Sequence, residues 1–316
     1  MTGSATGSAA PVARADAGVE RLRTLILQHA PYDAEFALRV EGVSVARATR
    51  THDVLVHSVQ RPALCVVVQG SKTVYVGAEQ YEYNPQRMLL YTVNLPIAFQ
   101  VTQASGAEPF LTFKLDLDPQ RIAELALRLY PHGLPRAAGG RGVQVMDVTD
   151  RVVSAAIRLL EAVQDEREAR WIGPLVVEEL LIRLLLSPAG ALVAQLGQVE
   201  SNTQRVARAI EWIQAHFDEP LNIEALASTV HMGVSTLHAH FKAVTSMSPL
   251  QFQKHLRLQE ARRLMVTTTM DAGTAGRQVG YASASQFTRE YTRLFGSTPR
   301  RDIAHFRDRA MTLEPG

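Results

Sequence analysis

The sequence predicts an α+β protein with two units: an N-terminal β domain with a helical segment, followed by an all-α domain. Three observations lead to this prediction. Short apolar runs separated by turn residues fill residues 36–116, and apolar residues at helical spacing fill residues 204–302. Within the second region, one helix-turn-helix pattern occurs twice.

The chain has 316 residues, which is enough for two domains. Residues 1–18 are small and polar and lack the apolar stretch of a secretion signal, so we expect a disordered tail there. We expect the β domain with its helical segment over residues 19–198, a linker over residues 199–203 and the double helix-turn-helix domain over residues 204–309.

The β domain is predicted from four short apolar or alternating runs. They are residues 64–68, 74–76, 88–93 and 110–115. In the last run, Leu111, Phe113 and Leu115 share one face, because side chains alternate along a strand. Several short strands at this spacing are typical of a sandwich or a barrel.

A helical segment follows the strands. Asp118 suits an N-cap and Pro119 the first helical position, so a helix is expected from there. Asp150 is the expected N-cap of a second helix. Residues 175–185, after Gly173, are so apolar that the helix must bury much of its surface. Packing on the β domain is the favoured interpretation, and a dimer interface is the alternative; both can hold together.

The helix-turn-helix pattern repeats at a nearly constant offset. The first three positions of the pattern are repeated 49 residues later: Leu226, Ala227 and Val230 correspond to Ala275, Gly276 and Val279. The next four are repeated 50 residues later: Leu237, Phe241, Val244 and Pro249 correspond to Phe287, Tyr291, Leu294 and Pro299. The second turn therefore carries one more residue. Two copies of one supersecondary unit are expected.

The spacing of the two copies suggests DNA as the partner. Residues 249–265 predict one connecting helix, which spans roughly 25 Å. With packing at each end, it sets two recognition helices about 34 Å apart, which is one turn of B-DNA. Charge agrees: residues 201–316 carry 14 Lys and Arg against 10 Asp and Glu, whereas residues 1–200 carry 19 against 21.

Composition excludes several other classes. No run approaches 18 uncharged apolar residues, so no membrane span is expected. Cys65 is the only cysteine, which excludes a disulfide framework and indicates the cytoplasm. It stands in an apolar run, so a buried, inert thiol is favoured over a redox sensor. His52 and His57 are five residues apart and form no metal-binding pair, so we expect neither metal, cofactor nor enzymatic activity.

Both halves resemble the AraC-type transcription regulators. The N-terminal resemblance runs through residues 62–72, 81–85 and 115–119, and the C-terminal one through residues 279–289 and 295–299. The first copy of the repeat matches through residues 226–227, Met232, Leu237, residues 241–242 and 248–249. The resemblance implies a cupin-like β barrel that senses a small molecule and helps the chain to dimerise.

The resemblance and the helical pattern point to the same DNA contacts. The expected base-reading residues are Ser235, Thr236, His238 and Ala239 in the first recognition helix and Ala284, Ser285, Gln286 and Arg289 in the second. Arg289 is suited to guanine and Gln286 to adenine. Phosphate contacts are expected from Lys242, Ser283, Arg293, Arg300 and Arg301. Ser283 is also the expected N-cap of the second recognition helix. For each cation, a solvated surface charge is the alternative.

The sequence departs from the family pattern at a few positions. Gly233 replaces the usual capping Ser, Gly276 belongs to an Ala-Gly pair that replaces Ile-Ala, and Asp302 replaces an aromatic residue. These changes predict a second motif that is less stable or binds less tightly. Ala239 removes a polar or basic group, which predicts weaker base reading by the first helix.

We therefore expect an AraC-type regulator that binds double-stranded DNA as a homodimer, responds to a small effector, and contacts RNA polymerase if it activates. The aromatic candidates for the effector pocket are Tyr75, Tyr91, Phe99 and Phe113. One alternative is an effector-independent regulator, favoured by a barrel without a pocket. The other is a cupin-type metal enzyme with a regulatory domain, which needs clustered ligands.

Overall fold

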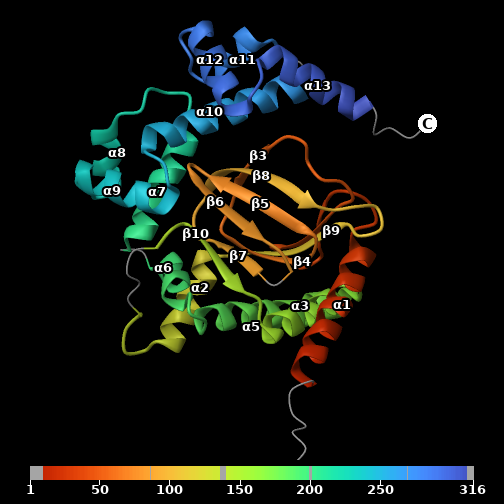
Figure 1. Cartoon of the computed structure of the whole chain (residues 1–316). Helices are drawn as coiled ribbons and strands as arrows, with labels where there is room; N and C mark the ends of the chain where they lie inside the picture. The colour runs from red at the N-terminus through yellow and green to blue at the C-terminus, as the bar shows by residue number, and fades with distance from the viewer. Residues whose placement is uncertain (1–9, 86, 136–139, 199–200, 269, 312–316) are drawn as a thin grey trace, which may run out of the picture.

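The computed structural model describes residues 10–85, 87–135, 140–198, 201–268 and 270–311 (Figure 1). Among the residues described, the N-terminal part contains ten strands. They are β1 (Glu35–Ala37), β2 (Val43–Ala48), β3 (Val56–Gln60), β4 (Ala63–Gln69), β5 (Ser71–Val76), β6 (Glu79–Tyr83), β7 (Arg87–Tyr91), β8 (Leu95–Gln103), β9 (Phe110–Asp116) and β10 (Val143–Asp147).

The strands form two antiparallel sheets. Their orders are β1-β2-β9-β4-β7-β10 and β3-β8-β5-β6. These described strands do not close into one hydrogen-bonded ring, so the barrel is an open one, made of two facing sheets. The register is well defined; Val66 of β4, for example, lies opposite Phe113 on one side and Met88 on the other.

The six-stranded sheet is buried on both faces. Leu64, Val66 and Val68 of β4 pack in one core with the helices, while Cys65 and Val67 belong to the core between the sheets. This explains why residues 64–68 are continuously apolar instead of alternating.

Six helices belong to this part of the chain. They are α1 (Ala10–His29), α2 (Pro119–Leu129), α3 (Asp150–Ala162), α4 (Glu166–Trp171), α5 (Gly173–Leu185) and α6 (Gly190–Gly197). Figure 1 shows α1, α3 and α5 on the face of the sheet opposite the C-terminal domain. Leu180, Leu181 and Leu184 of α5 are buried in the shared core, which bears out the expected packing of this apolar helix on the β domain.

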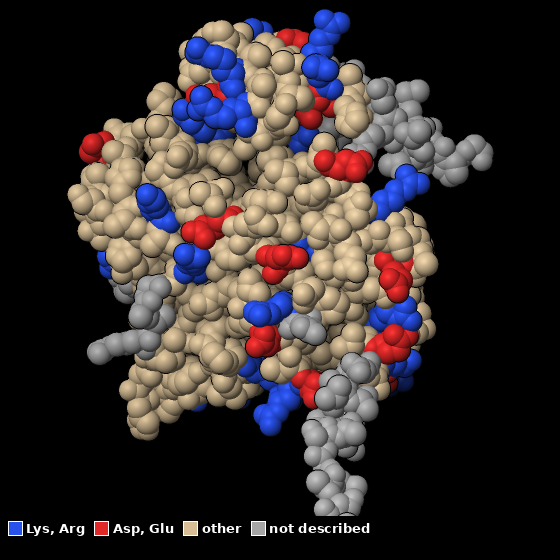
Figure 2. Space-filling view, in the orientation of Figure 1, with Lys and Arg blue, Asp and Glu red and all other residues tan. Residues whose placement is uncertain are grey.

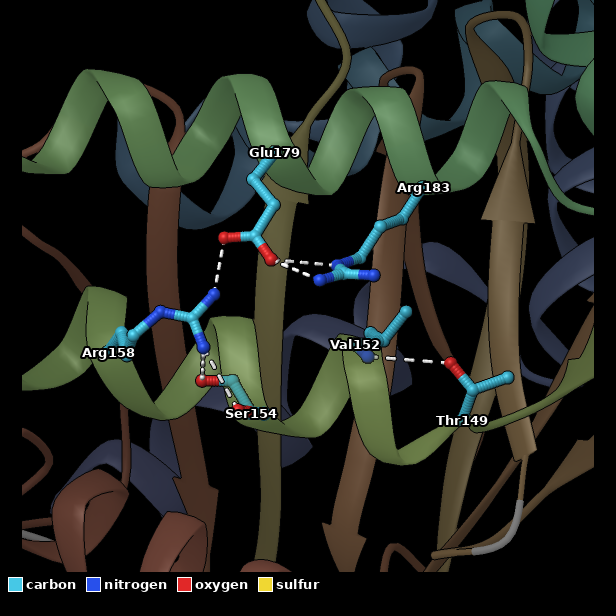
Figure 3. A network of polar contacts seen from close by, with 6 residues as sticks. All are labelled: Thr149, Val152, Ser154, Arg158, Glu179 and Arg183. Carbon is cyan, nitrogen blue, oxygen red and sulfur yellow. Dashed lines mark hydrogen bonds and ion pairs between the residues drawn. The ribbon is translucent and has the colours of Figure 1, made fainter.

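Polar contacts tie α3 to α5 above that core (Figure 3). Glu179 of α5 accepts hydrogen bonds from Arg158 of α3 and from Arg183 one turn along its own helix. Arg158 also donates to the hydroxyl of Ser154 at 2.9 Å. The hydrogen bond from Arg158, reinforced by Arg183, lowers the pKa of Glu179 despite its partial burial.

The structure differs from the sequence predictions in three local features. Helix α1 begins at Ala10, so residues 10–18 are helical where a disordered tail was expected; residues 1–9 lie outside the described part. Strand β10 adds to the sheet after the region where strands were expected to end. The N-cap of α3 is Thr149, whose side chain accepts from Val152, rather than Asp150.

The C-terminal part is entirely helical. Its helices are α7 (Asn202–Ala215), α8 (Ile223–Thr229), α9 (Val234–Thr245), α10 (Pro249–Thr267), α11 (Ala272–Gln278), α12 (Ala284–Phe295) and α13 (Pro299–Met311). Ser201 caps α7, so this helix begins inside the expected linker, of which residues 199–200 are not described. The α+β class, with a β unit followed by a helical unit, is confirmed.

The two parts of the chain are packed together. Leu95 and Ile97 of β8 share one buried cluster with Ile213 of α7 and Phe241 of α9. The second helix-turn-helix has a separate core around Tyr281, Phe287 and Tyr291. The first motif is therefore built onto the β domain, whereas the second is carried by α10.

Within the described residues, no single helix is both long enough and apolar enough to cross a bilayer; α5 and α6 reach that length only as a pair bent by 119°.

Candidate DNA-binding surface and barrel cavity

The two helix-turn-helix motifs are equivalent at the level of the backbone. His231, between α8 and α9, has φ 53°, and Gly280, 49 residues later between α11 and α12, has φ 87°. Ser246 and Gly296, at the ends of α9 and α12, have φ 59° and 74° and are 50 residues apart. The left-handed turns thus follow the offsets of the sequence repeat.

All eight expected base-reading residues are exposed on the two recognition helices. They are Ser235, Thr236, His238 and Ala239 on α9 and Ala284, Ser285, Gln286 and Arg289 on α12. Leu237 and Phe287, between them in sequence, are buried. The apolar face of each helix therefore anchors it, and the opposite face of its first turns is open to a partner.

The two recognition helices are capped differently. The Ser283 hydroxyl accepts a hydrogen bond from the backbone N–H of Gln286 at 3.3 Å, which agrees with its expected role as the N-cap of α12. Gly233 occupies the equivalent place before α9 and provides no side-chain cap. The N–H groups at the start of α9 are thus left for solvent or an anion.

The remaining expected phosphate contacts are exposed as well: Lys242, Arg293, Arg300 and Arg301. In Figure 2, Lys and Arg side chains gather at the upper end of the molecule, where Figure 1 places α11 and α12.

A polar network that sequence reasoning missed supports the second recognition helix. Glu290 accepts hydrogen bonds from Lys254 of α10 and the Tyr281 hydroxyl, both at 2.8 Å, and from Gln286 at 3.2 Å. Burial alone would raise the pKa of Glu290, but these three donors lower it. The network orients Gln286, one of the expected base readers, before any DNA is bound.

A cavity of about 480 Å³ lies in the β domain. Tyr91 and Phe99, two of the expected pocket residues, are in its lining. Tyr75 and Phe113 are not. Phe113 faces the helices, because its neighbours Thr112 and Lys114 face the cavity and side chains alternate along β9.

Charged groups that the sequence did not reveal also line the cavity. Lys114 lies 3.3 Å from Glu35 and 3.4 Å from Asp116, and these carboxylates raise its pKa although burial opposes them. Lys72 lies with its Nζ 3.7 Å from the centre of the Phe99 ring. Burial lowers the pKa of Lys72 to about 8.

Cys65 is buried and also lines the cavity. Burial raises the pKa of its thiol to about 11, so the thiol is protonated at neutral pH. A protonated thiol is a weak nucleophile, which agrees with the inert cysteine favoured above.

Comparison with protein families identifies both units. Residues 39–192 match the family described as the AraC-type transcriptional regulator N-terminus, and residues 226–304 match a helix-turn-helix domain. This chain belongs to the AraC-type transcriptional regulators. The AraC-type match begins after β1 and ends within α6, so it covers strands β2 to β10 and helices α2 to α5.

Relatives of this AraC-type chain include two activators of Escherichia coli. The HTH-type transcriptional activator RhaS of strain O1:K1 / APEC is 25% identical over 177 residues, which is 55% of this chain and 62% of RhaS. The RCS-specific HTH-type transcriptional activator RclR of strain K12 is 30% identical over 146 residues, 46% of this chain and 44% of RclR. The chain thus aligns with less than two thirds of either relative.

Among solved structures, ToxT from Vibrio cholerae O395, bound to (E)-4-(8-methylnaphthalen-1-yl)but-3-enoic acid, has a TM-score of 0.53 at 10% identity. The similarity covers 83% of this chain and 97% of that one. At this identity, the similarity concerns the fold.

The departures from the AraC-type pattern have structural explanations. A side chain at position 276 would place its Cβ 3.0 Å from the Phe287 ring, so Gly276 permits close packing of α11 on α12. Asp302 is buried and accepts two hydrogen bonds from Arg262, at 2.7 and 2.8 Å, and one from the Tyr291 hydroxyl at 2.7 Å. The predicted weakness of the second motif stays a prediction.

The described residues contain no group of three or more His, Cys, Asp or Glu side chains placed to hold a metal ion.

Proposed function

We propose that this AraC-type chain is a sequence-specific DNA-binding transcription regulator. The observation that carries the proposal is the backbone-equivalent pair of helix-turn-helix motifs, each with an exposed first turn on its recognition helix. The connecting helix α10 has 19 residues, so it extends about 28 Å between the motifs. This length supports insertion of α9 and α12 into successive major grooves.

The cavity supports a response to a small-molecule effector. Its volume of about 480 Å³ is in the range of small-molecule pockets, and a barrel filled by side chains would have favoured an effector-independent regulator instead. In this proposal, the effector binds one arrangement of the two units better than another and so changes DNA binding.

A homodimer is the proposed working form. Trp171 of α4 and Leu175 of α5 are 68% and 62% exposed, which is unusual for large apolar side chains and suits a second copy as partner. Sedimentation should show a dimer that Leu175→Glu dissociates, whereas Val54→Glu, at an exposed site before β3, should leave it intact. A monomeric wild-type protein would refute this part.

The further roles are proposed by analogy with the relatives. We propose that the chain acts in the cytoplasm without enzymatic activity, and that it contacts RNA polymerase if, like RhaS and RclR, it is an activator.

The DNA-binding proposal is tested by selection from random duplexes with the full-length chain. We expect enrichment of a site with two blocks whose centres are 10–10.5 base pairs apart. Affinity should fall steeply with salt, because phosphate contacts release counterions. Failure to enrich any sequence would refute the proposal.

A further inference from the structure

Lys72 stands apart from the other cations that line the barrel cavity. Lys114 lies within 3.4 Å of two carboxylates, and Arg47 lies 3.6 Å from Asp33. Arg50 is exposed to solvent. Lys72 is partly buried and lies against the Phe99 ring, and among the described residues it forms no ion pair within 4 Å and no hydrogen bond; Glu35, which is paired with Lys114, acts on it only at longer range.

An ammonium in this position is unfavourable for the fold. Transfer of a charge from water into a low-dielectric site costs free energy unless an opposite charge or hydrogen bonds compensate it. The ring of Phe99 compensates only in part. With a pKa of about 8, Lys72 is still mostly protonated at neutral pH, so the cavity contains a positive charge that no carboxylate pairs directly.

The part of the lining formed by aromatic side chains specifies the other end of a ligand. Phe99, Phe110, Tyr83 and Tyr91 belong to this part, whereas the charged side chains of Asp33, Glu35 and Lys114 line the cavity elsewhere. Burial raises the pKa of both tyrosines well above the usual value, so their hydroxyls remain hydrogen-bond donors rather than anions. A cation without an ion pair, together with these aromatic side chains, matches a molecule with one anionic group and an apolar body.

We propose that the cavity binds a small monocarboxylic acid, whose carboxylate pairs with the ammonium of Lys72 and whose apolar body packs against Phe99 and Tyr91. This inference rests on the proposed effector role of the cavity. Carboxylate binding also gives a reason for a lysine at position 72, where an apolar residue would stabilise the unliganded barrel.

The test uses the full-length chain and two matched probe pairs, 4-phenylbutyrate with 4-phenylbutanamide and octanoate with octanamide. The two members of each pair share the same apolar body, and their head groups are a charged carboxylate and a neutral amide. Calorimetry should show that the carboxylate of at least one pair binds about 10- to 100-fold more tightly than its amide, as expected for a hydrogen bond to a charged group. An equal affinity within both pairs, or no binding of either carboxylate, overturns the proposal.

Variants assign the effect to Lys72. Lys72→Met should abolish the carboxylate preference and raise the Tm of the unliganded protein, whereas Lys72→Arg should retain the preference. Arg61→Met removes an exposed cation of the same domain outside the cavity and should change neither quantity. A preference that survives in Lys72→Met, or a Tm that falls in that variant, overturns the proposal.

DNA binding is measured on the same samples with the selected duplex. If the protein binds DNA specifically but shows no carboxylate preference, only this inference fails. If it does not bind DNA specifically, the proposed function fails as well.

Discussion

His57 of β3 lies edge-on against Phe295, the last residue of the second recognition helix, with ring centroids 4.7 Å apart. The same Phe295 ring lies 4.5 Å from the guanidinium of Arg262 on α10. A strand of the β domain, the connecting helix and the recognition helix therefore meet at one point. This contact joins the β domain directly to the second motif, which otherwise has its own core.

Acidification should weaken this interface through His57. Burial, with the charge of Arg262 and the neighbouring His255, lowers the pKa of His57 from 6.5 to about 4, although Asp302 opposes the shift. The unfolded chain thus binds a proton more readily than the folded one between these pH values. The contribution of neutral His57 to the free energy of unfolding is complete above pH 6.5 and is lost as the pH falls toward 4.

We expect the free energy of unfolding to fall by about 1–2 kcal/mol more between pH 7 and pH 5 in the wild type than in His57→Phe. Urea denaturation at each pH measures this difference. Burial also lowers the pKa of His255. Because His255 is present in both proteins, its effect on the free energy of unfolding cancels in the comparison. Replacement of the exposed His132 by Gln is the control. An identical pH dependence in His57→Phe and wild type would contradict the assignment.

The ion pair between Arg262 and Asp302 should be essential for the second motif. The residues are 9% and 8% exposed, so loss of either partner removes the ion pair of a charge that stays buried. Asp302→Ala should therefore destabilise the fold by about 3–5 kcal/mol. Tyr291→Phe removes one hydrogen bond to Asp302 and should cost only about 1 kcal/mol.

Thermal unfolding and hydrogen exchange in α12 and α13 measure these effects. The double variant Arg262→Met/Asp302→Leu removes both buried charges, so its stability should exceed that of Asp302→Ala, which keeps one of them. A double variant less stable than Asp302→Ala would show that packing around the two residues, rather than the charge, is what matters.

The features that the sequence predicted best are local. Helix spacing and the offsets of 49 and 50 residues predicted the two motifs, because helix-turn-helix geometry depends on neighbours within about twenty residues. The structure repeats these offsets in the positive φ of His231 and Gly280. The N-caps Asp118 and Ser283 were predicted for the same reason, since a cap acts on the next three residues.

The features that escaped prediction depend on distant contacts. Alternation shows that Leu111, Phe113 and Leu115 share a face of β9, but not whether that face is covered by the helices or borders the cavity. The sequence places Phe113 in the pocket, whereas in the structure it packs on the helices. Strand β10 exists through its pairing with β7, some fifty residues earlier in the chain. That Lys72 has no ion pair of its own likewise depends on distant contacts, because the fold places Glu35 and Asp116 within 3.4 Å of Lys114.

The turn before the second recognition helix should tolerate only glycine. At Gly280, φ is 87° and a Cβ would lie 2.0 Å from the carbonyl oxygen of Asp218. Gly296 has a similar φ of 74° but open space around it. Gly296→Ala should cost about 1–2 kcal/mol from backbone strain alone, and Gly280→Ala should cost more because a clash is added.

Denaturant titration of the two variants separates strain from clash. Specific DNA binding should be impaired more by Gly280→Ala, since this turn orients α12. Equal stabilities of Gly280→Ala and Gly296→Ala would show that the backbone around Asp218 adjusts without cost.

Base reading and phosphate contact should be separable within the second motif. Arg289 is exposed on the first turns of α12, where a bidentate contact to guanine is feasible. Arg289→Ala should weaken binding to the selected site by about 1–3 kcal/mol and relax the preference at one base pair. Arg300, at the start of α13, is the matched control, because it is exposed but lies outside the recognition helix.

Arg300→Ala should weaken binding to all duplexes alike and reduce the salt dependence by about one counterion, as loss of a phosphate contact does. Competition binding to single-base variants of the site, at two salt concentrations, distinguishes the two patterns. If Arg289→Ala weakens all duplexes equally and leaves every base preference in place, Arg289 contacts a phosphate, and sequence reading by α12 falls to Gln286 and Ser285.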